Sequence, residues 1–347
     1  MSLSERQDLF GLEPEGLANA LAKIGEPGYR GRQVARWIYR RRVTDFAKMT
    51  DLPVPLRVRL EREFVISCIK PSRTVRSTDG TRKMIFELQE GAIESVLLFD
   101  IDRRTLCISS QIGCPMDCSF CATGKMGFTR NLSAGEIVGQ VLAANDLLAP
   151  QERVTNIVFM GMGEPLLNYD PLVRAIQILS SELGPEISQK KMTVSTIGLV
   201  PQIKKIADSG LKVGLAISLF SADERTRQKF IPIEKKYPLD EIKKAALTFT
   251  EKTRRRITFE IVLIKDVNDS LAQAKKLVSF IHGIPCKINL IRFHPHPGSG
   301  LAKPDEDRLR AFRDYLYPRV TAVTIRKSFG EDIAAACGQL ATQHSSA

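Results

Sequence analysis

Seven short runs rich in valine and isoleucine, each separated from the next by a helix-like segment, constrain the fold of this chain more than any other feature. The runs are RRTLCISS, RVTNIVFMG, KKMTVSTIG, VGLAISLF, RRITFEIVLI, CKINLIRF and TAVTIRKS. Strands that alternate with helices predict parallel strands in right-handed βαβ units. Because these strands are too few for a closed eight-stranded barrel, we expect an α/β fold built as a partial (β/α)6-type barrel.

Polar or unusual residues stand where these expected strands end. Cys114 follows the first strand, Gly163 and Glu164 follow the second, Ser195 ends the third and Ser218 ends the fourth. Barrels of parallel strands carry their active sites on the rim formed by the carboxyl ends of the strands. We therefore expect a functional site at this rim.

Residues 1–90 are helix-like and rich in arginine, and they predict a small, mainly helical domain ahead of a core domain at 91–347. Its densest stretch is YRGRQVARWIYRRRV (Tyr29–Val43). Apolar residues there fall at helical spacing, which predicts a helix packed on one side. The remaining positions carry five arginines, which predict an RNA-binding accessory domain, with a solvated charged face as the alternative: Arg32, Arg36, Arg40, Arg41 and Arg42.

The charge balance favours a polyanionic partner. The chain has 347 residues and carries 51 Lys and Arg against 39 Asp and Glu, a net charge of +12. Such an excess is typical of proteins that bind nucleic acid, although a basic protein without a specific partner is the alternative. With neither a signal-peptide pattern nor an apolar run of membrane-spanning length, we expect a cytoplasmic protein without a membrane partner.

Three of the seven cysteines, Cys114, Cys118 and Cys121, form a Cys-x₃-Cys-x₂-Cys motif in GCPMDCSFCATG. Clustered cysteines in a protein without an export signal indicate metal ligands or catalytic thiols rather than disulfides. A structural zinc site usually has four ligands. Three thiolates instead predict a [4Fe–4S] cluster with one open iron, to which an amine and a carboxylate could chelate. A non-enzymatic zinc- and RNA-binding module is the alternative.

The segment VFMGMGEPLLN is a second candidate binding element. Its strand leads into Gly161, Gly163 and Glu164, where an exposed backbone and a carboxylate could bind a ligand's amino group. Such a turn is alone a weak indication, and it gains weight from its position beside the cysteine loop. Between the two elements, Ser133 followed by Glu136 predicts a capping box at a helix start.

These segments together resemble one protein family. GCPMDCSFCATGKMGFTRNL, GMGEPLLN, STIG, PIEKKYPLDE, VNDS, KINLIRF and DIAAACGQL are similar, in collinear order, to motifs of the radical S-adenosylmethionine (radical-SAM) adenine methyltransferases of the RlmN and Cfr type. The resemblance runs from about Pro27 to Leu340. It implies a radical-SAM barrel, a [4Fe–4S] cluster and two S-adenosylmethionine molecules per turnover. It further implies methylation of an sp² adenine carbon in 23S rRNA and, for members of the RlmN type, in tRNA, with an external reductase such as flavodoxin or ferredoxin.

The resemblance also assigns residues. Cys337 looks like the cysteine that is methylated first and then carries the methylene group to the base. Cys107 looks like the cysteine that resolves the covalent adduct by forming a disulfide, and Glu94 matches the proton acceptor. The cofactor contacts implied by the family's motifs are Gly163, Glu164, Ser195, Ser218, Leu219, Phe220 and Asn289. We expect a monomer.

The sequence departs from the family at one of these positions, because Phe220 stands where a histidine is usual. GMGEPLLN resembles the branch that methylates C2, whereas NLIRF and VTIRKSFG are closer to the branch that methylates C8. We expect C2 of adenine 2503 in 23S rRNA, with adenine 37 of tRNA as a further substrate and C8 as the alternative. A radical-SAM enzyme acting on another substrate is a further alternative. Cys68 and Cys286 match no catalytic position, and His294 and His296 are expected to shape a rim loop or touch RNA.

Overall fold

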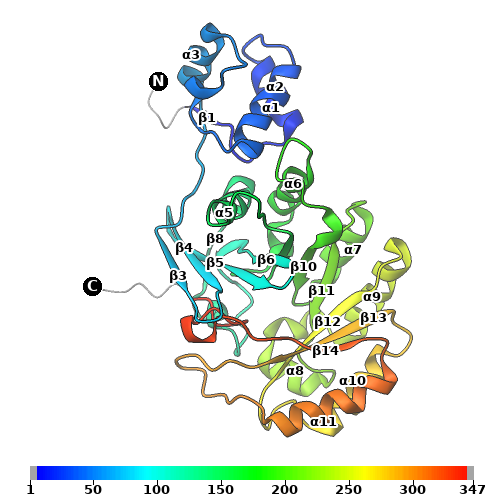
Figure 1. Ribbon diagram of the computed structural model, residues 1–347. Coiled ribbons are helices and arrows are strands. Elements are labelled where there is room, and N and C mark those ends of the chain that lie inside the picture. The colour runs from blue at the N-terminus through cyan, green and yellow to red at the C-terminus, as the bar shows by residue number, and fades with distance from the viewer. Residues whose placement is uncertain (1–5, 342–347) are drawn as a thin grey trace.

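The computed structural model describes residues 6–341 and shows a small helical lobe above a larger α/β domain (Figure 1). The larger domain is built on a mixed ten-stranded sheet. In spatial order its strands are β14 (Val323–Ile325), β13 (Cys286–Arg292), β12 (Ile257–Leu263), β11 (Gly214–Ser218), β10 (Met192–Thr196), β9 (Asn156–Phe159), β6 (Arg103–Cys107), β5 (Gly91–Asp100), β4 (Arg82–Leu88) and β3 (Arg73–Arg76).

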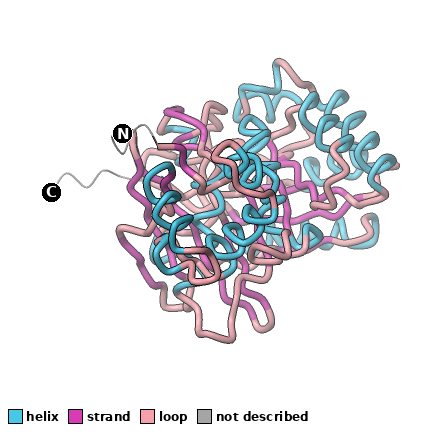
Figure 2. Tube along the Cα trace, turned by 90° about the horizontal axis from the view of Figure 1, so that it is seen from above, coloured by secondary structure: helices cyan, strands magenta, loops and turns pink. Residues whose placement is uncertain are grey.

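Seven strands of this sheet are parallel to one another and coincide with the seven runs expected from the sequence: β6, β9, β10, β11, β12, β13 and β14. The expected α/β fold with a partial barrel is confirmed, since the two edge strands of the sheet do not pair with each other. Successive parallel strands are connected by the helices α5 (Ala134–Asp146), α6 (Tyr169–Ser180), α7 (Val200–Asp208), α9 (Leu239–Thr253), α10 (Leu271–Ile281) and α11 (Glu306–Leu316). In the view from above, helices flank the strands on the right-hand side of the molecule (Figure 2).

Shorter elements follow the carboxyl ends of the first and fourth parallel strands. After β6 come the hairpin of β7 (Gln111–Gly113) and β8 (Phe128–Asn131) and the short helix α4 (Ala122–Lys125), and after β11 comes α8 (Glu224–Phe230). Helix α5 begins with the expected capping box: the Ser133 hydroxyl accepts from the Glu136 amide at 3.1 Å and the Glu136 carboxylate from the Ser133 amide at 2.8 Å.

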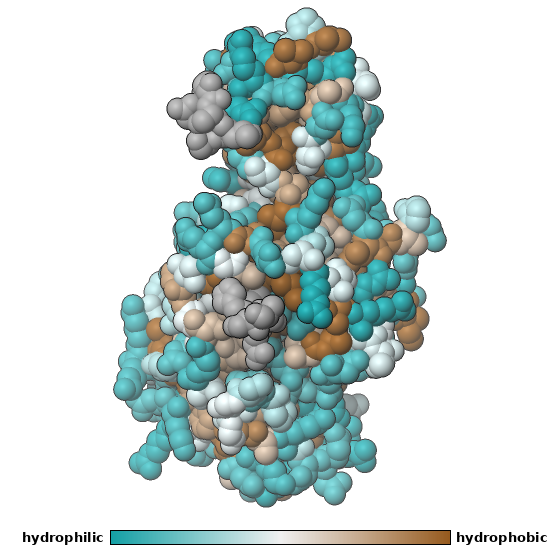
Figure 3. All heavy atoms as spheres, turned by 90° about the vertical axis from the view of Figure 1, so that its left-hand side faces the viewer, coloured by the Kyte–Doolittle hydropathy of each residue, from teal (hydrophilic) through white to brown (hydrophobic). Residues whose placement is uncertain are grey.

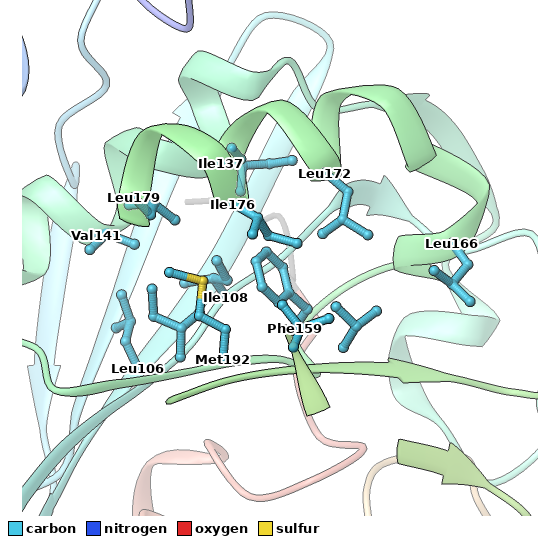
Figure 4. Close-up of a cluster of buried hydrophobic side chains, with 14 of the residues drawn as sticks. Leu106, Ile108, Ile137, Val141, Phe159, Leu166, Leu172, Ile176, Leu179 and Met192 are labelled. Carbon is cyan, nitrogen blue, oxygen red and sulfur yellow. The ribbon is translucent and has the colours of Figure 1, made fainter. Parts of the chain in front are cut away.

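The core lies between the sheet and its helices. Apolar side chains of α5 and α6, such as Ile137 and Ile176, point onto β6, β9 and β10 (Figure 4). There they meet the strand residues Leu106, Phe159 and Met192, and all five side chains are fully or almost fully buried. Strands covered in this way need apolar residues in near-continuous runs, which is the pattern read from the sequence. Within residues 6–341, no helix combines the length and the apolar character that crossing a membrane requires.

The N-terminal lobe consists of α1 (Pro14–Ala22), α2 (Tyr29–Ala35), a π-helical continuation of α2 at Arg36–Arg40, and α3 (Val54–Glu63). Two short parallel strands, β1 (Gln7–Asp8) and β2 (Phe64–Val65), tie its beginning to its end. In the space-filling view the lobe stands at the top of the molecule, and hydrophilic residues cover much of the visible surface (Figure 3).

The helical character of the first 90 residues ends earlier than the sequence suggested. β3 and β4 lie before residue 90, yet β4 pairs along its whole length with β5 and belongs to the large sheet. The hairpin between them holds the far end of the chain: the Ser77 hydroxyl donates to Asp332 at 2.5 Å and the Gly330 amide donates to Asp79 at 2.9 Å. Structurally, the core domain therefore begins near residue 73.

The arginine-rich helix is packed as expected on its apolar side, where Trp37, Ile38 and Tyr39 are buried. Three of its arginines, however, point at acidic residues of the core domain. Arg32 pairs with Glu182 at 2.6 Å, Arg40 with Glu186 at 3.7 Å, and Arg42 with Asp146. These pairs span the lobe and the core domain, so part of the run is an interdomain contact.

A buried ion pair fixes the rim of the barrel. The guanidinium of Arg227, on α8, is completely buried and bonds Glu234, which itself is only 4% exposed. The same group donates to the carbonyls of Ile197 at 2.6 Å, Ser218 at 3.2 Å and Leu219. These carbonyls follow or end β10 and β11, so a single side chain holds the two strand ends together.

Replacing Arg227 with Met should destabilise the protein by about 3–5 kcal/mol, because the buried Glu234 carboxylate would lose its cation and three carbonyls would each lose a donor. Urea denaturation of the reduced, cluster-free protein, followed by circular dichroism, measures this change. Lys252→Met, which removes an exposed pair with Asp208, is the matched control and should cost less than about 1 kcal/mol. Equal effects of the two substitutions would contradict this role of Arg227.

Candidate functional site

The three motif cysteines line one cavity at the carboxyl ends of the parallel strands. We call it the cluster cavity. Its other lining residues include most of the cofactor contacts expected from the sequence: Gly163, Glu164, Ser195, Ser218 and Phe220. Strands β9, β10 and β11 thus each contribute through the residues at or just after their ends, as the rim position predicted.

The cysteine loop is shaped by hydrogen bonds to elements on both sides of it. The Cys114 amide donates to the Gly127 carbonyl at 2.7 Å, and the Ser119 amide donates to the Phe230 carbonyl at 3.1 Å. Phe120 stacks on Phe220 with ring centroids 4.8 Å apart and planes inclined by 3°. The aromatic beside the last cysteine therefore covers the cavity together with the residue that replaces the usual histidine.

The chemistry of these thiols fits a metal cluster. Burial raises the pKa of Cys114 to about 12 and that of Cys118 well above its ordinary value, and each is raised further by neighbouring anionic groups. Thiols in such a place stay protonated unless a cation stabilises the thiolate, as a bound metal does. Among residues 6–341, no three His, Cys, Asp or Glu side chains converge as one mononuclear ion requires, whereas in a cubane the cysteines bind separate irons.

Glu164 is rigidly placed beside the cysteines. Its carboxylate accepts from the Ile197 amide at 2.8 Å and from the Leu166 amide at 3.1 Å, while its own amide donates to Gln111 at 2.8 Å. Burial raises the pKa of Glu164 to about 7, although the hydrogen bonds from Ile197 and Leu166 act in the opposite direction and lower it. The cavity therefore offers a fixed acceptor for a ligand's ammonium group.

The glycines of this turn are required by close packing. Gly163 has a φ of +96°, and a Cβ there would lie 2.5 Å from the Cβ of Gln111. A Cβ on Gly161 would lie 2.8 Å from the backbone of Ile108. The turn after β9 therefore lies directly against the strand that leads to the cysteine loop.

Cys337 lies between the cluster cavity and a second cavity, which we call the thiol cavity. Cys337 lines both, and Cys107, at the end of β6, lines the thiol cavity. Burial raises the pKa of Cys107 to about 12, and Cys337 is the neighbour that raises it next most. The structure thus brings together the two cysteines that are distant in sequence from the motif.

The segment that carries Cys337 is anchored beside the cysteine loop. The Ala122 amide donates to the Gly338 carbonyl at 2.8 Å, and the Thr123 hydroxyl donates to the Leu340 carbonyl at 2.5 Å. Cys337 itself is exposed, in contrast to the buried Cys118. An exposed thiol on an anchored segment is accessible to both a cofactor and a large substrate.

Three of the expected site residues do not line either cavity. Leu219 is fully buried and offers only its backbone. Asn289 does not line the cluster cavity itself but contacts a residue that does, because its side-chain amide donates to Glu260 at 3.0 Å. Glu94 faces a neighbouring hollow that contains Lys83, whose ammonium lies 3.4 Å from the Glu94 carboxylate.

The remaining cysteines and histidines of interest lie around the site. Cys286 is buried in β13, and Cys68 packs against the core. His294 is buried in the wall of the thiol cavity, 3.0 Å from the Ser328 hydroxyl. His296 lies in the following loop, with its ring 6.2 Å from that of Phe293.

Sequence reasoning missed two charged residues that line the cluster cavity, Glu260 and Arg326. Glu260 lies within β12 and Arg326 directly follows β14. Their charged atoms are 3.6 Å apart. The pKa of Arg326 is raised above its ordinary range, first by Cys337 and then by Glu260. The signal available in the sequence was a charged residue inside or just after a Val- and Ile-rich strand.

Comparison with known proteins places this site in a family. Residues 108–278 match the Radical SAM superfamily, and residues 7–66 match the ribosomal RNA large subunit methyltransferase N-terminal domain. A Desulfotalea psychrophila protein named dual-specificity RNA methyltransferase RlmN is 44% identical over 347 residues, which cover 97% of this chain and 96% of that protein. A Geobacter sulfurreducens protein of the same name is 46% identical over 334 residues, covering 96% and 91%.

A solved structure agrees with these sequences. The crystal structure of a radical SAM methyltransferase from Sphaerobacter thermophilus superposes with a TM-score of 0.92 at 42% identity, covering 97% of this chain and all of that one. This similarity spans the lobe, the barrel and the anchored segment, and it supports an enzyme rather than a zinc-binding module. The chain belongs to the RlmN family of radical-SAM RNA methyltransferases, whose cofactors are a [4Fe–4S] cluster and S-adenosylmethionine.

Proposed function

We propose that this enzyme methylates C2 of adenine 2503 in 23S rRNA and of adenine 37 in tRNA, in the cytoplasm. The observation that carries the proposal is the position of Cys337, which lines both the cluster cavity and the cavity that contains Cys107. A thiol in this place can receive a methyl group on one side and present it to a base on the other. The names of the relatives, dual-specificity RNA methyltransferases, support both RNA substrates.

The cofactors supply a methyl group and, at the reduced cluster, a 5′-deoxyadenosyl radical. Cys114, Cys118 and Cys121 would hold the cluster, and Glu164 would bind the amino group of S-adenosylmethionine. Ser195 and Ser218, whose hydroxyls are 3.4 Å apart on the cavity wall, are placed to bind further polar groups of the same ligand. Two S-adenosylmethionine molecules are consumed per turnover, and flavodoxin or ferredoxin supplies electrons to a monomeric enzyme.

The chain's own thiols carry the carbon. The thiolate of Cys337 takes the methyl group from the sulfonium, and after hydrogen abstraction its methylene carbon bonds to the adenine. The adduct then loses one electron, for which the oxidised cluster would be the acceptor, and the proton on the ring carbon, so that the ring becomes aromatic again. The sulfur of Cys107 then attacks that of Cys337, a disulfide forms, and the bond between sulfur and the methylene carbon breaks. The electron pair of that bond goes to the carbon, which takes a proton to become the methyl group.

Glu94 is proposed to accept the proton that leaves the ring carbon. It lies two residues before Val96 on β5, and Val96 pairs with Cys107 and lines the thiol cavity. Successive even-numbered positions of a strand share one face, so Glu94 lies on the same face as these residues. Burial raises the pKa of Glu94, which suits a group that accepts a proton.

The reconstituted enzyme should convert adenosine in an rRNA fragment to 2-methyladenosine, and Cys337→Ala should reduce product by at least about 10³-fold, because the carbon carrier is removed. Nucleoside mass spectrometry against 2-methyl- and 8-methyladenosine standards measures both results. Cys286→Ala is the matched control, since that thiol lies outside both cavities. An 8-methyl product would contradict the proposed carbon, and methylation by the Cys337 variant would contradict the proposed carrier.

Cys107→Ala should trap the enzyme on its RNA, because the adduct on Cys337 can form but no second thiol resolves it. A denaturing gel should show a slower protein–RNA band that disappears in the Cys107→Ala, Cys337→Ala double variant. Normal turnover without this band would remove Cys107 from the reaction.

The N-terminal lobe is proposed to contact RNA through the arginines that do not reach the core domain. The side chain of Arg36 is exposed, and Arg41 lies over the Trp37 ring at 4.0 Å. In contrast, Arg32 and Arg42 are engaged by Glu182 and Asp146. The lobe thus combines a docking side with a free basic side.

Replacing Arg36 and Arg41 with Ala should lower the slope of log K against log salt for RNA binding by up to about 2, since each arginine would neutralise one phosphate. Filter binding at several salt concentrations measures the slope. Arg32 and Arg42, replaced together, are the control and should leave the slope nearly unchanged. The reverse result would assign RNA binding to the paired arginines instead.

A further inference from the structure

Arg326 occupies the junction of the two cavities. It directly follows β14, and its amide donates to the Leu290 carbonyl at 2.8 Å, which fixes it at the carboxyl-terminal rim of the barrel. Its side chain lines the cluster cavity and the thiol cavity, as Cys337 does. Among the described residues that line both cavities, it is the only cation.

The guanidinium of Arg326 is held by few partners. One nitrogen donates to the sulfur of Met160 at 3.4 Å and lies 3.6 Å from the Glu260 carboxylate. A guanidinium has five N–H donors, so these two contacts leave donors that face the cavities. The side chain is 24% exposed, which means that a ligand can reach it.

A chain of hydrogen bonds behind Arg326 fixes its direction. The Thr324 hydroxyl donates to Asn289 at 2.6 Å, and the Asn289 amide donates to Glu260 at 3.0 Å. Glu260 in turn faces Arg326 and is 5% exposed in its side chain. Asn289 therefore orients Arg326 through Glu260 and does not itself reach the cavity surface.

The thiol cavity suits a flat aromatic ring. Apolar side chains from three parts of the chain form its walls, including Val96, Leu98, Ile291 and Leu340. Both cysteines that must meet the substrate, Cys107 and Cys337, open into it. A purine between apolar walls still needs partners for its ring nitrogens, because burying them unpaired is unfavourable.

We propose that Arg326 is a catalytic residue that binds the target adenine in the thiol cavity and donates a hydrogen bond to one of the two ring nitrogens, N1 or N3, that flank the carbon that is methylated. This inference rests on the proposed function. It deepens that function by assigning the base to a cavity and naming the group that recognises it.

The donor is placed where charge and spin develop. When the methylene carbon on Cys337 adds to the ring carbon, a carbon–carbon bond forms and the π bond between that carbon and the nitrogen breaks. The unpaired electron moves to the nitrogen, and no proton or electron leaves in this step. A fixed cationic donor at the nitrogen stabilises this arrangement more than the free base, which is the condition for catalysis. Arginine stays charged, so it donates without giving up its proton.

Two variants, Arg326→Met and Arg326→Lys, test the assignment in the Cys107→Ala background, where the covalent RNA adduct accumulates. Arg292→Met is the matched control, because Arg292 lies on the neighbouring strand and pairs with Glu306 at 2.8 Å, an interaction outside both cavities. Three quantities are measured: S-methylation of Cys337 by peptide mass spectrometry, RNA affinity by filter binding, and the single-turnover rate of adduct formation.

In Arg326→Met we expect Cys337 methylation and RNA affinity within about threefold of the parent, and an adduct rate lower by about 10²-fold or more. Arg326→Lys should recover part of that rate, since it restores a cationic donor without the planar fork. An adduct rate within about threefold of the parent in Arg326→Met would overturn the proposal. Loss of Cys337 methylation would overturn it as well, because Arg326 would then act on the thiol. If the unsubstituted enzyme leaves RNA unmethylated, the proposed function itself fails.

Discussion

The buried guanidinium of Arg227 is the interaction on which the rim of this barrel depends. A charged group removed from water must find partners for its donors, and Arg227 finds them in Glu234 and in carbonyls at the ends of two neighbouring strands. Ser195 and Ser218 belong to those strands. Moving one of these strand ends away from the other would therefore deprive the buried guanidinium of an acceptor. The cofactor-binding wall thus takes its rigidity from an ion pair that touches no cofactor.

The parallel half of the fold was predictable because its strands are covered on the outer side by helices and so must be apolar along their length. The antiparallel half was not. β3 and β4 mix charged and apolar residues without strict alternation, as in RTVR and RKMIFEL, and so resemble the helical region before them. Their role depends on Asp332, which lies 255 residues beyond Ser77. No local pattern in the sequence announces an interaction over that separation.

The residues of the site likewise fall into those that a local sequence pattern predicts and those that it does not. Glu164, Ser195 and Ser218 could be found from position, because each stands at or shortly after the end of a parallel strand, and Cys114 could be found from its cysteine motif. Cys107 and Cys337 look like small apolar residues in their surroundings, and only the resemblance singled them out. Arg326 was overlooked because a cation after a strand looks like ordinary surface. The arginine-rich run shows the opposite error, since a pattern of charges cannot distinguish a phosphate from Glu182 or Asp146 of the same chain.

Phe220 shows how a departure from the family can leave the site's geometry intact. Its backbone adopts a left-handed conformation, with a φ of +65°, and its carbonyl accepts from Asn268 at 2.8 Å. These features belong to the main chain, so they do not require the usual histidine. The side chain instead stacks between Phe120 and Phe230, at 4.8 and 5.1 Å. At this position the enzyme has an apolar cover beside Cys121 in place of a hydrogen-bond donor. On the proposed function, the polar recognition of S-adenosylmethionine would come from Glu164, Ser195, Ser218 and the backbone around them.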